Sequence, residues 1–344
     1  MTSSSNSSGF LAGLNEAQSR AVGHHCGPLL VVAGAGSGKT RALTHRIAHL
    51  LGQHGVDPAE LLAVTFTNKA AREMKERLEL LLAQRLAQAQ FGQPMATLPE
   101  GEQRQLRSRI HREVTRELWI GTFHALFARL LRFDIDKYTD PEGHTWTRQF
   151  SIYDEGDAQS LVKEIVTQEL QLDPKRFEPK KLRWAISNAK NQGWLPHDLE
   201  QQEVGQGQRG KLLVETYRRY RRALAANNAL DFDDLLLLPV QLLRQNDQVR
   251  GYWHRRFRHL LVDEYQDTNR TQYELLKLLV TDGQDPAGFS DWQNRSVFVV
   301  GDADQSIYSF RAADFTILMG FQSDFGDGAA DDSTRTMEIG RAHV

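Results

Sequence analysis

The chain has 344 residues, enough for two domains, and its hydrophobic (40%) and charged (25%) fractions are those of a globular protein. A net charge of -2 argues against a uniformly basic nucleic-acid coat but leaves room for a local basic groove. The single cysteine, Cys26, excludes an intramolecular disulfide, and no apolar run is long enough for a membrane span or a signal peptide. We therefore expect a cytoplasmic protein without a membrane partner.

The first predicted elements alternate between buried strands and helices. Residues 1–9 are rich in Ser and Asn and are expected to be a disordered tail. The apolar run 28–33 predicts a buried parallel strand, and after a glycine-rich turn a helix begins at about Lys39. A second buried strand is predicted over 61–66, with a long helix from Asn68. This order is typical of an α/β sheet flanked by helices.

The middle of the chain has a different pattern. Residues 84–117 are polar, rich in Gln and Arg, and are expected to be a surface insertion, a helical hairpin with a loose tip. Residues 126–210 contain no comparable strand run and are expected to form an inserted helical subdomain. A helix is predicted over 211–226, and strands over 259–262 and 296–300 return the chain to the sheet.

The sharpest motif lies between the first strand and its helix. Small residues let successive backbone N–H groups point at phosphate oxygens, and the helix N-terminus adds its positive dipole end. Lys39 is expected to neutralise the β- and γ-phosphates, and the Thr40 hydroxyl to hold Mg²⁺. The first position of such a loop is usually glycine, and here it is alanine. A turn without a ligand is the disfavoured alternative. The expected nucleotide-binding residues here are Ala33, Gly34, Ala35, Gly36, Ser37, Gly38, Lys39 and Thr40.

A second candidate site follows the strand at 259–262, at the edge where open α/β sheets bind ligands. Asp263 is expected to hold Mg²⁺, and Glu264 to orient and deprotonate the water that attacks the γ-phosphate. The alternative is that this acidic cluster caps the next helix, since residues 267–269 are good N-cap residues.

A third candidate site, at 301–311, follows the strand at 296–300. Gln305 is expected to sense the γ-phosphate. Tyr308, Phe310 and Arg311 offer two rings and a cation to unpaired bases, and each stacked base contributes about 1–3 kcal/mol. The alternative is that the two aromatic residues belong to the core.

Together these motifs resemble the UvrD/Rep/PcrA group of superfamily 1 DNA helicases over most of the chain. Gln18 stands in a segment similar to the family's Q motif, whose glutamine reads adenine. Segments 65–71 and 121–125 resemble motifs Ia and Ib, which contact single-stranded DNA. Further matches are 231–235, where the chain re-enters the first motor domain, and 263–267 and 301–311, which resemble motifs II and III.

The resemblance implies a P-loop NTPase of the α/β class, with a RecA-like parallel sheet flanked by helices and an inserted all-helical, DNA-binding subdomain. The RecA-like domain is expected over 10–125 and 211–325. The implied cofactors are ATP and Mg²⁺, and the implied catalytic residues are Lys39, Glu264 and Gln305. The implied DNA contacts are Thr65, Phe66, Asn68, Thr122, Phe123, His124, Tyr308, Phe310 and Arg311.

The function implied is that of an ATP-dependent DNA helicase or translocase, moving 3′ to 5′ on single-stranded and forked DNA in repair or replication. One alternative is the helicase part of a helicase–nuclease, which a downstream nuclease domain would reveal. Another is a non-catalytic module with ATP-modulated DNA binding. A kinase or GTPase is disfavoured, because the motifs at 263–267 and 301–308 fit neither. The sequence identifies no protein partner.

Three features depart from the family pattern. Residues 84–117 are longer than the usual link between motifs Ia and Ib, and Arg311 is followed by Ala-Ala instead of Gly-Ala. The Asn-Tyr-Arg-Ser motif of a second RecA-like domain is absent, and 338–344 can be back-translated into a sequencing adapter. We therefore expect 326–344 to be a truncation tail. Arginines of a second domain would raise the rate about 10³–10⁵-fold, so weak turnover is expected of this chain.

Overall fold

A six-stranded parallel sheet, in the order β3-β2-β6-β7-β1-β8, lies at the centre of the molecule. The structure is a computed structural model that describes residues 9–34, 36–202, 207–302, 315–325 and 336–338. The predicted parallel α/β sheet is confirmed. Its strands are β1 (Gly27–Val32), β2 (Leu61–Thr65), β3 (Trp119–Thr122), β6 (His259–Val262), β7 (Ser296–Gly301) and β8 (Thr336–Glu338).

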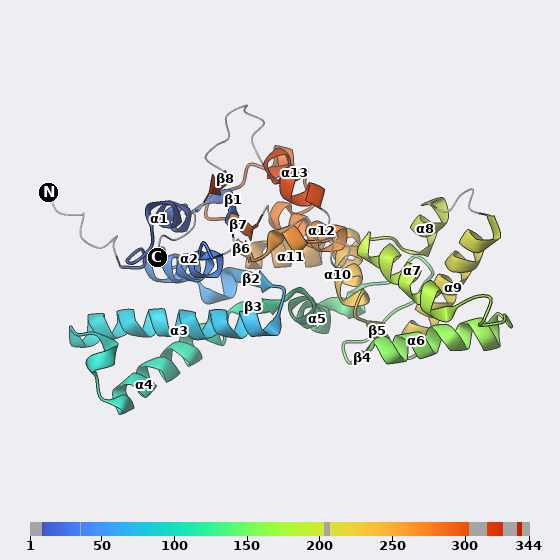
Figure 1. Ribbon diagram of the computed structural model, residues 1–344, viewed down its shortest axis with the longest axis horizontal. Helices are drawn as coiled ribbons and strands as arrows, with labels where there is room; N and C mark the ends of the chain where they lie inside the picture. Colours follow the sequence, from blue (N-terminus) through green and yellow to red (C-terminus); the bar gives the residue numbers. More distant parts are fainter. Residues whose placement is uncertain (1–8, 35, 203–206, 303–314, 326–335, 339–344) are drawn as a thin grey trace.

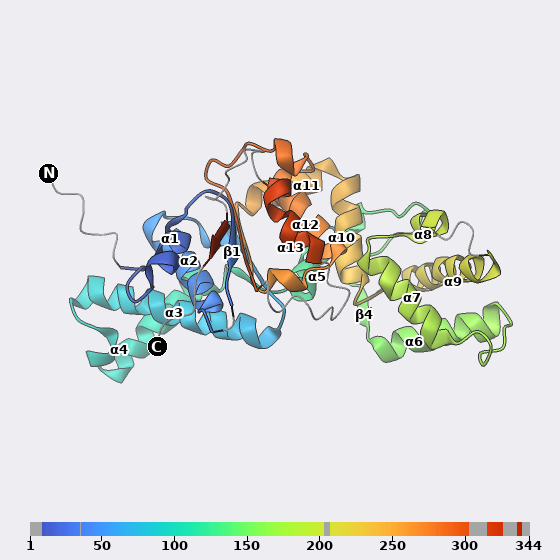
Figure 2. The ribbon, with the colours of Figure 1, turned by 45° about the horizontal axis from the view of Figure 1, so that its top comes forward.

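Helices cover both faces of this sheet, which explains why its strands are continuous apolar runs (Figure 1). Alternate side chains enter two cores: Leu29, Val31 and Phe298 point to one face, whereas Leu30, Val64 and Val299 point to the other. The first face carries α1 (Glu16–Gly23), α2 (Lys39–Gln53), α3 (Asn68–Phe91) and α4 (Glu100–Ile110). Figure 2 shows the second group on the opposite side of β1, consisting of α5 (Phe123–Asp134), α10 (Asp234–Gln245), α11 (Asp247–Arg256), α12 (Arg270–Thr281) and α13 (Phe315–Phe325).

At one end of the elongated molecule, α3 and α4 form the expected helical hairpin (Figure 1). A π-helical turn, His111–Thr115, continues α4 toward the sheet. The expectation of a loose tip was wrong, since Met95 and Leu98 are buried there. They belong to the same core as the sheet residues, so apolar packing fixes the hairpin to the body of the protein.

The opposite end is the helical subdomain, built from α6 (Glu155–Glu164), α7 (Pro179–Asn191), α8 (Pro196–Gln202) and α9 (Gly207–Ala226). Its expected bounds, 126–210, differ from the packing at both ends. Residues from α5 to Phe150 belong to the core under the sheet, whereas Tyr217 and Tyr220 of α9 are buried in the core of the subdomain. The packing therefore places the subdomain at about 151–229.

Four short strands were not predicted. β3 has only four residues, and β4 (Ser151–Tyr153) pairs in parallel with β5 (Ala229–Asp231) where the chain enters and leaves the helical subdomain. The fourth, β8, lies in the expected tail and pairs in parallel with β1, with Leu30 opposite Thr336. Within the described ranges, no helix is long and apolar enough to cross a membrane.

Candidate nucleotide site and adjoining groove

The loop between β1 and α2 makes a tight turn at the carboxyl edge of the sheet. The Ala33 N–H donates to the Gly301 carbonyl at 2.9 Å, which ties the loop to β7. Gly36 and Gly38 have φ values of +76° and +82°, in the left-handed region that favours glycine. The backbone conformation of this predicted phosphate loop thus explains why glycine occupies two of its positions. Ala35 lies outside the described residues.

Gln18 supports the loop from α1. It is buried, and its Nε2 donates to the Ser37 carbonyl at 2.8 Å. Its other end is fixed, because Gln18 and Asn15 form a reciprocal capping box at the start of α1. A Cβ added to Gly38 would lie 2.8 Å from Gln18 Nε2, so this brace requires a residue without a side chain there. Reading of adenine by Gln18 stays a prediction.

The structure brings the lysine of the loop against two acidic residues from distant segments. Lys39 Nζ lies 3.2 Å from Glu264 Oε2 and 3.3 Å from Asp302 Oδ2. The neighbouring Thr40 hydroxyl donates to Asp263 Oδ2 at 3.4 Å. The first two predicted sites are therefore one site. Asp302 was missed by the sequence analysis, although its place directly after β7 was a usable signal.

The acidic pair after β6 is held in two different environments. Burial, and then the charge of Glu264, raises the pKa of Asp263 to about 6. Glu264 itself has a φ of +50° and accepts a hydrogen bond from Gln266 Nε2 at 2.8 Å. Of the predicted N-cap candidates at 267–269, Asn269 caps α12, whereas Asp263 and Glu264 contact Thr40 and Lys39.

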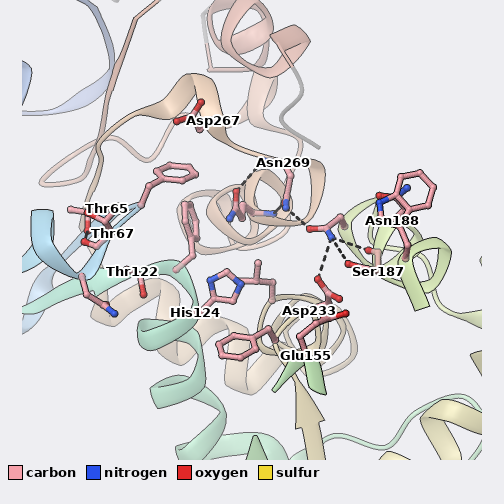
Figure 3. Close-up of a pocket in the computed structure, with 18 residues that line it drawn as sticks. Thr65, Thr67, Thr122, His124, Glu155, Ser187, Asn188, Asp233, Asp267 and Asn269 are labelled. Carbon is pink, nitrogen blue, oxygen red and sulfur yellow. Dashed lines mark hydrogen bonds between the residues drawn. The ribbon is translucent and has the colours of Figure 1, made fainter. Parts of the chain in front are cut away.

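A groove of about 1120 Å³ opens between the sheet and the helical subdomain. Figure 3 shows its walls, with Thr65 and Thr122 on one side and Asn188 and Glu155 on the other. Its lining residues are Thr65, Phe66, Thr67, Asn68, Thr122, Phe123, His124, Glu155, Trp184, Ser187, Asn188, Asn191, Phe232, Asp233, Leu236, Asp267, Asn269 and Gln272. These side chains include no lysine or arginine.

Six of the predicted DNA-contacting residues line this groove: Thr65, Phe66, Asn68, Thr122, Phe123 and His124. Two of them are buried. Phe123 is 2% exposed and stacks on Phe127, and the Thr65 hydroxyl donates to the Thr67 carbonyl. Their position suits them to shaping the wall rather than to presenting a side chain. Gln305, Tyr308, Phe310 and Arg311 lie outside the described residues.

Two aromatic residues of the groove were missed. Trp184 on α7 is 67% exposed and Phe232 after β5 is 50% exposed, which is unusual for rings of this size. The Phe232 ring lies 6.0 Å from that of His124. A tryptophan among the polar residues of the predicted helical region was the available signal. Only the tertiary structure places it opposite the segments at the sheet edge.

One short segment belongs to both sites. Asp263 contacts Thr40 and Glu264 contacts Lys39, and Asp267, only three residues beyond Glu264, lines the groove. A single 3-10 turn, Tyr265–Asp267, separates the two sites. A conformational change at Glu264 can therefore be transmitted to the groove through this turn.

Residues 14–326 match the family described as the UvrD/REP helicase N-terminal domain. The chain belongs to this family. It is 40% identical over 316 residues to the ATP-dependent DNA helicase PcrA of Bacillus subtilis (strain 168), which covers 92% of this chain and 36% of that protein. The PcrA proteins of Staphylococcus aureus and Staphylococcus epidermidis are 38% and 39% identical over 312 residues, with 91% and 36% covered. The resemblance is confirmed, and the chain spans about a third of the length of these relatives.

Proposed function

We propose that the chain is the ATP-binding part of an ATP-dependent DNA helicase or translocase, which moves 3′ to 5′ along single-stranded DNA in repair or replication. The observation that carries the proposal is the single segment from Asp263 to Gln272 that contributes to both the nucleotide site and the groove. We place this activity in the cytoplasm and include forked DNA among the substrates, as the family membership suggests.

In this proposal Lys39 binds the β- and γ-phosphates of ATP. Its ammonium now faces two carboxylates, so phosphate oxygens would compete with Glu264 and Asp302 for the same donor. The loop at 33–38 would supply backbone N–H groups, and the N-terminus of α2 would add its dipole. Glu264, positioned by Gln266, would accept a proton from the attacking water.

The oxygens of Thr40 and Asp263 fit Mg²⁺, which prefers hard oxygen ligands and keeps several water and phosphate ligands. In the part of the chain that the structure describes, no group of three or more His, Cys, Asp or Glu forms a metal site of its own. That donor set suits an ion that arrives with the nucleotide. When bound, Mg²⁺ would neutralise charge on the β- and γ-phosphates.

The groove would hold single-stranded DNA with its bases inward. The exposed rings of Trp184 and Phe232 can stack on bases, and stacking does not depend on sequence. The absence of cations among the lining side chains fits this orientation, because the phosphates would face outward. Helicase activity of the whole protein, rather than binding alone, requires more than these two sites.

Fluorescence anisotropy with a labelled single strand tests the proposal. We expect tighter binding to single-stranded than to duplex DNA, and an affinity that changes when Mg²⁺ and a non-hydrolysable ATP analogue are added. Lys39→Ala should abolish the nucleotide effect and Trp184→Ala should weaken DNA binding. Equal binding of duplex and single strand, without any nucleotide effect, would contradict the proposal. Single-turnover hydrolysis lost in Glu264→Gln would separate an enzyme from a non-catalytic module.

A further inference from the structure

Three cations gather beside the edge strand β3, away from the nucleotide site. The Arg129 guanidinium carbon lies 4.1 Å from the centroid of the Trp119 ring, and that of Arg256 lies 5.9 Å from it. Lys75 approaches Arg129 from α3 on the other face of the sheet. Glu79 and Glu117 are the acidic groups that face this cluster. Within the described chain, none of the three cations forms an ion pair with either.

The cations act on one another unfavourably. Burial, and then the charge of Arg129, lowers the pKa of Lys75. Burial, and then the charge of Arg256, lowers the pKa of Arg129. The Nε atom of Arg256 is also buried without a hydrogen-bond partner among the described residues. Like charges and an unsatisfied donor both raise the free energy of this site, and an anion bound there would relieve the repulsion between the cations.

Two exposed aromatic rings adjoin the cations. Phe133 is 49% exposed and Tyr252 is 50% exposed, and their ring centroids lie 5.9 Å and 5.1 Å from that of Trp253. Arg256 contacts the same Trp253 ring at 6.0 Å. Exposed rings next to unpaired cations combine the two contacts that single-stranded nucleic acid makes with proteins, stacking and phosphate neutralisation.

The cluster lies in line with the groove. Asn68 and Lys75 are seven residues apart in α3, and so are Thr122 and Arg129 at the cap and in the body of α5. Seven residues are close to two helical turns, so each pair shares a helix face and is about 10 Å apart. Because Asn68 and Thr122 both line the groove, two helices lead from it to the cluster. Roughly three stacked nucleotides span that distance.

We propose that Lys75, Arg129, Arg256, Phe133 and Tyr252 form a second contact, the β3-edge site, for single-stranded nucleic acid that leaves the groove. The proposal rests on the proposed function, since it extends a strand already held in the groove. An acidic protein segment would also meet the cations, but it would have no use for the exposed rings or for the alignment with the groove.

The test compares two single-stranded oligonucleotides, one of about four nucleotides that fills the groove and one of about twelve that reaches beyond it. The double variant Lys75→Gln/Arg129→Gln should leave the short oligonucleotide unchanged. For the long one, the loss of two phosphate contacts should reduce the salt slope by about 1.4 and the affinity roughly 25-fold near 0.1 M salt. Equal affinity of the variant and the unchanged chain for the long oligonucleotide would overturn the proposal.

The control variant is Arg104→Gln/Arg107→Gln on α4, which removes the same charge from the exposed surface at the far end of the hairpin. Its affinity for the long oligonucleotide should stay within about twofold. Arg129→Lys alone should retain the salt slope, because it keeps the charge, and this protects the test against local unfolding. Binding of polyglutamate in place of the long oligonucleotide would also overturn the proposal. If Trp184→Ala leaves both oligonucleotides unaffected, the groove proposal fails instead.

Discussion

The amide of Gln266 donates a hydrogen bond of 2.8 Å to the carboxylate of Glu264. The carbonyl of the same amide accepts the Asp302 N–H at 2.9 Å, and Asp302 in turn contacts Lys39. Gln266 thus links the three segments that form the candidate nucleotide site. Because the next residue, Asp267, lines the groove, a displacement of Gln266 would alter the wall of the groove.

Gln266→Ala should uncouple the nucleotide from DNA. The substitution frees Glu264 and leaves the buried Asp302 N–H without its acceptor, while the predicted phosphate loop is untouched. We expect nucleotide affinity to change by less than about threefold, whereas the effect of nucleotide on DNA affinity should fall by about tenfold, equivalent to about 1.4 kcal/mol of coupling. Anisotropy titrations with and without the ATP analogue measure this. An unchanged nucleotide effect would exclude Gln266 as the link.

Gly38→Ala should destabilise the chain even without nucleotide. Its φ of +82° disfavours alanine, and the new Cβ would meet Gln18 Nε2. We expect a loss of about 1–3 kcal/mol in the free energy of unfolding, together with weaker nucleotide binding. Gly34→Ala is the matched control, since its Cβ would meet no atom within 4 Å. Urea unfolding of both variants without nucleotide should separate them, and equal losses would refute the steric argument.

Trp184→Ala should weaken single-stranded DNA binding without loss of stability. The ring is 67% exposed, so its removal costs little packing, whereas a lost base stack is worth about 1–3 kcal/mol, or roughly 5- to 150-fold in affinity. Phe91→Ala removes another exposed ring, 39% exposed at the end of α3, and should bind DNA normally. Comparable affinities of the two variants would contradict the assignment of the groove.

His259 should make the fold sensitive to acid. Burial, and then the charge of Arg46, lowers its pKa to about 3 from the ordinary 6.5, so the folded protein holds it neutral. That stability is complete above pH 6.5 and is lost as the pH falls toward 3. His259→Gln should reduce the fall in unfolding free energy between pH 6 and 4 by about 1.4 kcal/mol per pH unit.

Urea unfolding at several pH values tests this dependence. His197→Gln is the control, because it removes a histidine whose side chain is 53% exposed. The two variants and the unchanged chain share every other titrating group, so only differences between their slopes count. Parallel curves for all three would show that the burial of His259 has no such consequence.

The sequence by itself determined the glycine-rich turn between β1 and α2, the position of the acidic pair after β6 and the family. These are local patterns: a glycine-rich turn between an apolar run and a helix, and carboxylates that end a strand. Their meaning does not depend on how distant segments meet. Four of the six strands of the main sheet were predicted in the same way, because strands that are buried on both faces have continuous apolar sequences.

Only the tertiary structure decided which residues act together. It placed Asp302 beside Lys39, turned Phe123 into the core and Trp184 into the groove, and assigned α9 to the helical subdomain. It also buried the tip of the hairpin at Met95. Each outcome depends on packing between elements far apart in the chain. Local periodicity shows that a residue is apolar or charged, but the neighbour that covers it or leaves it exposed is chosen by the fold.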